Sequence, residues 1–363
     1  MTIRDLIKFA STWGATFFCI AAYITPVLAQ PLHPTSVPAV IRVGQGHVIK
    51  TIAEAARLAR AGATIEVDSD VYVGDVALWQ QDNVTVRAVG GRVRLLANGA
   101  AVESKGIWVV RAKGMHVEGF DFEGAAVPSR NGAGIRLDTG TLHVKDCSFT
   151  HNEIGLLTNN DPDTVLEVEG SEFAYNMRPD GHNHNLYVGR IARLSVTGSY
   201  FHHAHIGHLL KSRAAVNHIF YNRLTDEATG RASYELEFPN GGLAYVVGNQ
   251  IQQGPLTENR TLISFGAEGY KSARNELYLV GNTLVDDYAG WGKWLAVKPA
   301  DHGAKDAVTA TVSVMAVNNL LSGSGRLDPG VPGDIRNNVN VGPDMFMQDQ
   351  GRTTACAIRS THP

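Results

Sequence analysis

The sequence contains few cysteines, few aromatic residues and little net charge. Only three of its 363 residues are cysteines, Cys19, Cys147 and Cys356, which is too few for a framework of disulfide bonds. Aromatic residues make up 8% of the chain while glycine occurs 38 times, and this composition fits many short strands with tight turns better than a helical bundle. The formal net charge of -3 argues against general binding of nucleic acids.

The N-terminal stretch "ATFFCIAAYITPVLA" has the pattern of a targeting segment. It follows the basic residues Arg4 and Lys8 and ends in small residues at Ala29, as a secretory signal does. We therefore predict a signal peptide over residues 1–29, cleaved after Ala29, and a secreted or periplasmic protein. Because the apolar run is short and is interrupted by Pro26, we expect no stable membrane span after cleavage.

A helical pattern follows a proline-rich linker, which we assign to residues 30–40. Apolar residues recur at helical spacing, and Gly62 stands where a glycine ends a helix. The strand-like run "TIEV" comes directly afterwards. The residues that share the helical spacing are Ile52, Ala55, Ala56 and Ala59.

One pattern of eight residues then recurs along the chain at intervals of 23 to 33 residues. Its third and eighth places are apolar in every copy, which is typical of a repeat protein built from stacked units. The copies are "MHVEGFDF", "LHVKDCSF", "LEVEGSEF", "LSVTGSYF", "NHIFYNRL", "AYVVGNQI" and "LYLVGNTL".

The helical pattern and the repeats together resemble the pectin-lyase-like superfamily of right-handed parallel β-helices. The resemblance implies an all-β fold, a right-handed parallel β-helix (solenoid) over residues 41–342 with an N-terminal capping helix. Such a helix has a physical purpose because the open end of the solenoid exposes its apolar interior. Residues 343–363 lack the repeat and are predicted to form a C-terminal tail.

The sixth place of each repeat is predicted to face inward at a turn. Small or amide side chains there can bond to the backbone of neighbouring coils, as a buried bend requires. Cys147 is thus predicted to be an interior packing residue and not a nucleophile. The residues at this place are Phe120, Cys147, Ser171, Ser199, Asn222, Asn249 and Asn282.

A second strand in each repeat is predicted to carry a polar outer face. Side chains on a strand alternate between faces, so placing Leu186, Leu210 and Leu236 inward turns their polar neighbours outward. Because adjacent coils lie about 4.8 Å apart, residues that are distant in sequence converge on this face, with histidines on the flanking loops. The residues expected on it are Tyr187, Lys211, Arg213, Glu235 and Glu237.

The resemblance implies that this face is a groove for a polysaccharide. Lyases that act on uronate polymers need one group to neutralise the sugar carboxylate and a base to remove the C5 proton. We therefore predict an enzyme, a polysaccharide lyase acting by β-elimination, with no cofactor and no metal. The predicted catalytic residues are Lys211 or Tyr187 as the base, Arg213, and His208 as an assisting group. The predicted substrate-binding residues are His182, His184, Asn185, Glu235 and Glu237.

Several alternatives remain open from the sequence. Glu235 and Glu237 stand about 6–7 Å apart by strand rise, near the lower limit for an inverting glycoside hydrolase. Their ion pairing with Lys211 and Arg213 counts against that role, because it keeps both acids deprotonated. A uronate C5-epimerase shares the proton-abstraction step, and a non-catalytic carbohydrate-binding or envelope β-helix is the rival from another class. The charges can also form only a surface ion-pair ladder.

The histidines are dense but lack the companions of a metal site. Pairs at i and i+2 can bind a transition metal, yet no adjacent cysteine or HExxH arrangement accompanies them. We expect His202 and His203 to be solvated in a turn and His218 to be structural. A polysaccharide is the expected partner, nucleic acid is not, and the sequence leaves the oligomeric state open.

Overall fold

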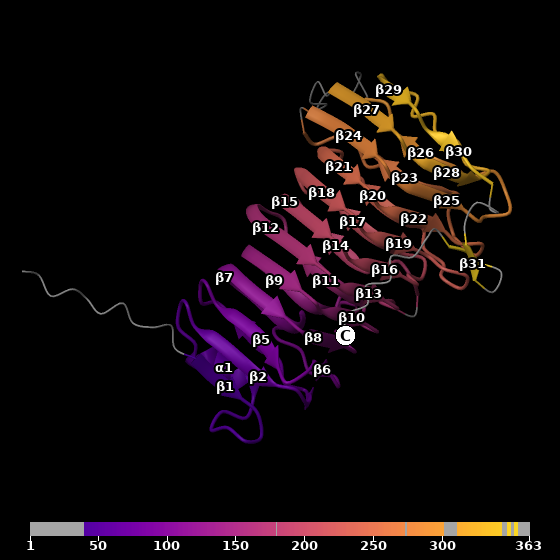
Figure 1. The fold of residues 1–363 in the computed structure, drawn as a ribbon. Coiled ribbons are helices and arrows are strands. Elements are labelled where there is room, and N and C mark those ends of the chain that lie inside the picture. Colours follow the sequence, from indigo (N-terminus) through magenta and orange to yellow (C-terminus); the bar gives the residue numbers. More distant parts are fainter. Residues whose placement is uncertain are drawn as a thin grey trace, which may run out of the picture. The chain divides into compact units, whose positions relative to one another are not determined.

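The chain forms repeated coils of parallel strands (Figure 1). The computed structural model describes residues 40–178, 180–272, 274–300 and 311–342, together with the backbone of two short strands near the C-terminus. Within these ranges nearly all regular structure is β, with one helix. The protein is therefore a parallel β-helix, the architecture that the resemblance implied. Residues 1–39 lie outside the described part, so the signal peptide and the linker stay predictions.

The strands fall into three rows, each of which pairs in parallel from coil to coil. The first row contains β1 (Val40–Val43), β2 (Thr64–Asp68), β5 (Thr85–Val89), β7 (Gly106–Glu118), β9 (Ala133–Lys145), β12 (Asp161–Glu169), β15 (Ile191–Thr197), β18 (Val216–Phe220), β21 (Leu243–Val247), β24 (Arg274–Val280), β27 (Thr311–Val317) and β29 (Gly333–Arg336).

The second row contains β4 (Ala77–Trp79), the first halves of β7 and β9, β11 (Ile154–Thr158), β14 (Leu186–Val188), β17 (His208–Ser212), β20 (Tyr234–Phe238), β23 (Thr261–Phe265) and β26 (Lys293–Val297). The third row is a separate sheet of β3 (Val71–Val73), β6 (Val93–Leu96), β8 (Phe120–Glu123), β10 (Ser148–Thr150), β13 (Glu172–Ala174), β16 (Tyr200–His202), β19 (Arg223–Thr225), β22 (Gln250–Gln253), β25 (Thr283–Asp286), β28 (Leu320–Gly323) and β30 (Val339–Asn340). An antiparallel pair, β31 (Met347–Asp349) and β32 (Arg352–Thr354), falls within the predicted tail.

The predicted helix is present as α1 (Ile52–Leu58). The Thr51 side chain caps its N-terminus by accepting a hydrogen bond from the Glu54 N–H. Ile52, Ala55 and Ala56 are buried in the same apolar core as the strands. With seven residues α1 is short, and no helix in the described ranges is long and apolar enough to cross a membrane.

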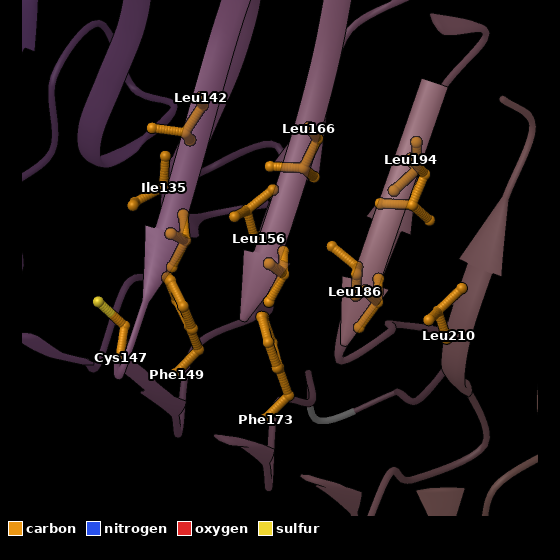
Figure 2. Close-up of a cluster of buried hydrophobic side chains, with 14 of the residues drawn as sticks. Ile135, Leu142, Cys147, Phe149, Leu156, Leu166, Phe173, Leu186, Leu194 and Leu210 are labelled. Atoms are coloured by element: carbon orange, nitrogen blue, oxygen red, sulfur yellow. The ribbon is translucent and has the colours of Figure 1, made fainter. Parts of the chain in front are cut away.

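The core consists of apolar side chains that repeat from coil to coil (Figure 2). Leu142, Leu166 and Leu194 come from the first row. In the third row Phe149 and Phe173 stack with ring centroids 4.7 Å apart. Offset or parallel stacking adds to the gain from apolar burial, so the rings help to hold successive coils in register.

A ladder of amides fills the predicted inward turns. Asn222 donates its backbone N–H to Asn249 Oδ1 at 2.8 Å, and Asn249 donates to Asn282 Oδ1 at 2.9 Å. The Asn249 amide also donates to the Ile219 carbonyl at 2.8 Å. The prediction for these turns is confirmed, and so is the interior position of Cys147, whose thiol pKa burial raises to about 12.

Asn249→Ala should destabilise the fold by about 1–3 kcal/mol for each buried group that it leaves unpaired. The change removes the acceptor of the Asn222 N–H and the donor to the Ile219 carbonyl. Denaturant unfolding measures the loss. Gln45→Ala, at an exposed position, is the control; equal stability of the two variants would show that the ladder is dispensable.

Candidate functional site

The second row places three of the predicted site residues in one column across neighbouring strands. β14, β17 and β20 are successive strands (Figure 1), and their register sets Tyr187 beside Lys211 and Lys211 beside Glu237. The leucines between them are fully buried. The predicted convergence of Tyr187, Lys211 and Glu237 is therefore confirmed.

Two carboxylates hold Lys211. Its Nζ lies 2.8 Å from Glu237 Oε2 and 3.0 Å from Glu268 Oε1. Lys211 and Glu237 are only 8% and 3% exposed, so this pairing is much less screened by water than a surface pair. With both carboxylates in contact, the Lys211 ammonium is better placed to hold Glu237 and Glu268 in position than to face a substrate.

Arg213 links Glu268, in the loop after β23, to Tyr187 of the column. Its guanidinium binds both oxygens of Glu268, at 2.8 and 2.7 Å, and donates to Tyr187 Oη at 2.5 Å. The same guanidinium lies 5.1 Å from the centre of the Tyr187 ring. This charge-assisted hydrogen bond fixes the position of the Tyr187 hydroxyl on the face.

Two stacked imidazoles complete this part of the face. The rings of His184 and His208 lie 4.5 Å apart, and the His184 ring also stacks on Tyr187 at 5.2 Å. The backbone N–H of His208 donates to His184 Nδ1 at 2.9 Å. Burial, followed by the charges of His208 and Lys211, lowers the pKa of His184 well below its usual range. Both the geometry and the electrostatics keep His184 neutral.

His208 lies between a carboxylate and the cations. Its Nδ1 is 3.1 Å from Glu237 Oε2. Burial lowers the pKa of His208, and the opposing attraction of Glu237 does not reverse this shift. Burial tends to raise the pKa of Glu237, but contacts with His208 and Lys211 outweigh it and hold that pKa below its usual value. At neutral pH a neutral imidazole therefore rests against a carboxylate.

Glu235 does not lie on the exposed face, and this expectation was wrong. Its side chain is 0% exposed, and neither carboxyl oxygen has a hydrogen-bond partner. Burial, together with the charges of Asp226 and Asp286, raises its pKa well above the usual value. Alternation along the strand alone does not predict this, because the burial depends on residues of neighbouring coils.

Asn185 is also inside the protein, contrary to its predicted place in the groove. Its Oδ1 accepts a hydrogen bond from the Asn176 amide at 2.9 Å, and its Nδ2 donates to the His202 carbonyl at 2.8 Å. The side chain is fully buried. Asn185 thus extends the amide pairing that stabilises the turns and is not positioned to touch a substrate.

The dense histidine stretch divides between two places. His182 is exposed beside half-buried His184, whereas His202 belongs to the third row and lies 3.0 Å from Glu172. The expected solvation of His202 is wrong, since it is 7% exposed and stacks on Tyr200. In the described part of the chain, no group of three or more His, Cys, Asp or Glu side chains is placed to hold a metal ion.

A pocket of about 350 Å³ opens next to Tyr187 and His184. Arg136, which the sequence reasoning missed, lies on its wall. Strand alternation over residues 134–138, "GIRLD", would have placed Arg136 on the outer face. The sequence reasoning also missed Glu268, because it lies in a loop insertion that has no strand periodicity. The lining is Asn131, Arg136, Ile154, Leu157, Thr158, Asn159, Asn160, His182, Asn183, His184 and Tyr187.

A larger depression of about 590 Å³ covers the third row. Its arginines are already paired, because Arg92 lies 2.6 Å from Asp121 and Arg94 lies 3.2 Å from Glu123. These acids line the same depression. This depression is therefore less suited to bind an anion than the pocket beside Tyr187.

Comparison with known proteins found only distant structural similarities. No protein-family model matches the chain, and no curated protein matches it. Among solved structures, pectate lyase Pel9A is similar with 11% identity and a TM-score of 0.43, over 88% of this chain and 82% of that one. The Escherichia coli protein YbhC has 11% identity and a TM-score of 0.33, over 92% and 89% of the two chains. The assignment as a parallel β-helix rests on the strand pairing of the chain itself.

Glu235→Gln should stabilise the protein at about pH 8 and change little at about pH 4. The pKa of Glu235 is raised in the folded state from its ordinary value of 4.5. Its contribution to stability is therefore fully present below pH 4.5. The free energy of unfolding then falls as the pH rises towards the folded-state pKa. The loss is about 1.4 kcal/mol per pH unit while the folded state keeps its proton. Thermal unfolding across pH measures it.

Glu118→Gln, which changes a half-exposed carboxylate, is the control for this comparison. Its effect should be small at every pH, because an exposed pair contributes about 0–1 kcal/mol. A loss of stability in Glu235→Gln at both pH values would mean that the Glu235 carboxylate has a stabilising partner, against the structure.

Proposed function

We propose that this protein is an exported polysaccharide lyase that cleaves an acidic, uronate-containing polysaccharide by β-elimination. The observation that carries the proposal is the Tyr187 hydroxyl, which Arg213 holds at 2.5 Å beside the neutral His184 ring at the edge of the pocket. A proton acceptor, cationic donors and a concave surface are thus together. Export follows from the N-terminal pattern and is part of the proposal.

The chemistry breaks two bonds of the sugar chain, C5–H and C4–O, and forms one carbon–carbon double bond. A base takes the C5 proton of the uronate residue, and its electron pair forms the C4=C5 double bond. The C4–O bond breaks, and the leaving oxygen takes a proton. Neutralising the sugar carboxylate makes the C5 proton more acidic, so a cation or hydrogen-bond donor must lie on that carboxylate.

Tyr187 is the base in this proposal rather than Lys211. Lys211 lies in contact with two carboxylates, whereas the Tyr187 hydroxyl accepts a charged hydrogen bond from Arg213 and lies at the edge of the pocket. His184 donates to the sugar carboxylate. His208, held against Glu237, assists by passing protons, and Lys211 fixes Glu237 and Glu268.

The position of Glu235 argues against the alternative of an inverting hydrolase. That mechanism needs two carboxyls facing a common groove, and Glu235 is fully buried. A C5-epimerase uses the same proton abstraction and differs only in returning a proton to the opposite face. The two activities are therefore separated by their products.

The wild-type protein should create unsaturated uronate ends on at least one member of a panel of acidic polysaccharides. Ultraviolet absorbance detects these ends. Tyr187→Phe should lower kcat by about 100-fold or more, because it removes the proton acceptor while leaving the ring. Tyr245→Phe, in the first row, is the matched control and should leave kcat unchanged.

Other outcomes contradict the proposal in distinct ways. Reducing ends without the absorbance mean hydrolysis, and solvent deuterium entering C5 without cleavage means epimerisation. Near-normal rates in Tyr187→Phe, Lys211→Ala and Arg213→Ala on a cleaved polymer mean that the chemistry lies elsewhere on the protein.

A further inference from the structure

Arg136 stands in the same column of the second row as Tyr187. Leu157 on β11 pairs with Arg136 on β9 and with Tyr187 on β14. Two strand spacings, about 10 Å, therefore separate Arg136 from Tyr187 along the stack. A ligand that contacts both residues must cross the strands.

The Arg136 guanidinium is incompletely paired. It donates to Asn159 Oδ1 at 2.5 Å, and its Nε lies 3.4 Å from Asp138 Oδ1. That Nε is buried and has no hydrogen-bond partner. Asp138 therefore attracts this nitrogen by charge but does not satisfy it with a hydrogen bond.

The charges behind the pocket wall leave a positive surplus. Asp138 is shared by Lys105 at 2.7 Å, Arg111 at 2.9 Å and Arg136 at 3.4 Å. Lys105 and Arg111 share one further carboxylate, Glu103. This cluster thus holds three cations and two carboxylates. By contrast, Glu237 and Glu268 balance Lys211 and Arg213 one for one.

The pocket wall adds donors but no acid. His182 and His184 line it with Arg136, and its lining contains no aspartate or glutamate. Its volume of about 350 Å³ lies in the range of small-ligand pockets. The chemistry that fits is a carboxylate on a polar, hydroxyl-rich ring.

We propose that the Arg136 pocket binds the carboxylate of a second acidic sugar residue, away from the residue that loses its proton at Tyr187. This inference rests on the proposed function and narrows it. The substrate is a polymer with acidic groups on more than one residue, lying across the strands along the stack. Arg136 is a specificity residue and does not touch the reacting atoms.

The test measures binding and turnover separately. Calorimetry uses hexamers of galacturonate, mannuronate and guluronate, and methyl-esterified hexagalacturonate as the neutral probe, with Tyr187→Phe as the background. Arg136→Ala should weaken the binding of the preferred charged hexamer by at least about tenfold, the effect of a charged hydrogen bond. Binding of the esterified hexamer should not change.

In the otherwise wild-type protein, Arg136→Ala should raise KM about tenfold and change kcat by less than about threefold. Arg136→Lys keeps the charge but loses the planar guanidinium, so its KM should lie between those of the wild type and Arg136→Ala. Arg193→Ala, an exposed arginine of the first row paired with Glu167, is the matched control. Circular dichroism and thermal unfolding confirm that each variant is folded.

Two of the three outcomes separate this inference from the proposed function. Cleavage by the wild type with unchanged hexamer binding and KM in Arg136→Ala overturns the pocket and leaves the lyase standing. Binding of a charged hexamer that depends on Arg136, without cleavage, supports the pocket and overturns the lyase. If no charged hexamer binds, both are wrong.

Discussion

Parallel pairing in register between successive coils is the constraint on which the rest of this structure depends. Each residue lies on its counterpart in the next coil about 4.8 Å away, so a buried polar side chain that recurs in every coil can pair with the one above and the one below it. The amides of Asn222, Asn249 and Asn282 pair in this way. The same pairing brings Tyr187, Lys211 and Glu237 into one column.

Strand alternation and repeat spacing were enough to predict the coils, the inward turns and that column, because they are local consequences of the pairing. Prediction failed where a neighbouring coil decides burial. Strand alternation predicts that Glu235 points outward, yet its side chain is fully buried near Asp226 and Asp286. Asn185 follows no repeat but joins the buried amides. Glu268 binds Lys211 and Arg213 from a loop, and no sequence period marks such a contact.

Charge balance divides the face into two parts with different tasks. Around Lys211 and Arg213 the cations and carboxylates cancel, and Lys211 and Glu237 are both buried. Such a centre suits the precise placing of Tyr187 and His208. Around Arg136 a positive charge remains and the pocket wall lacks acids. An anion is therefore attracted more strongly beside the proposed reaction centre than within it.

A crystal structure of Tyr187→Phe with a bound acidic hexasaccharide tests this arrangement most directly. The account predicts a sugar chain that crosses the strands of the second row, with one carboxylate in hydrogen-bond contact with Arg136. The C5 atom of another residue should lie against the ring at position 187. A chain bound instead over the third row near Arg92 and Arg94, or density for sugar nowhere on the second row, would contradict it.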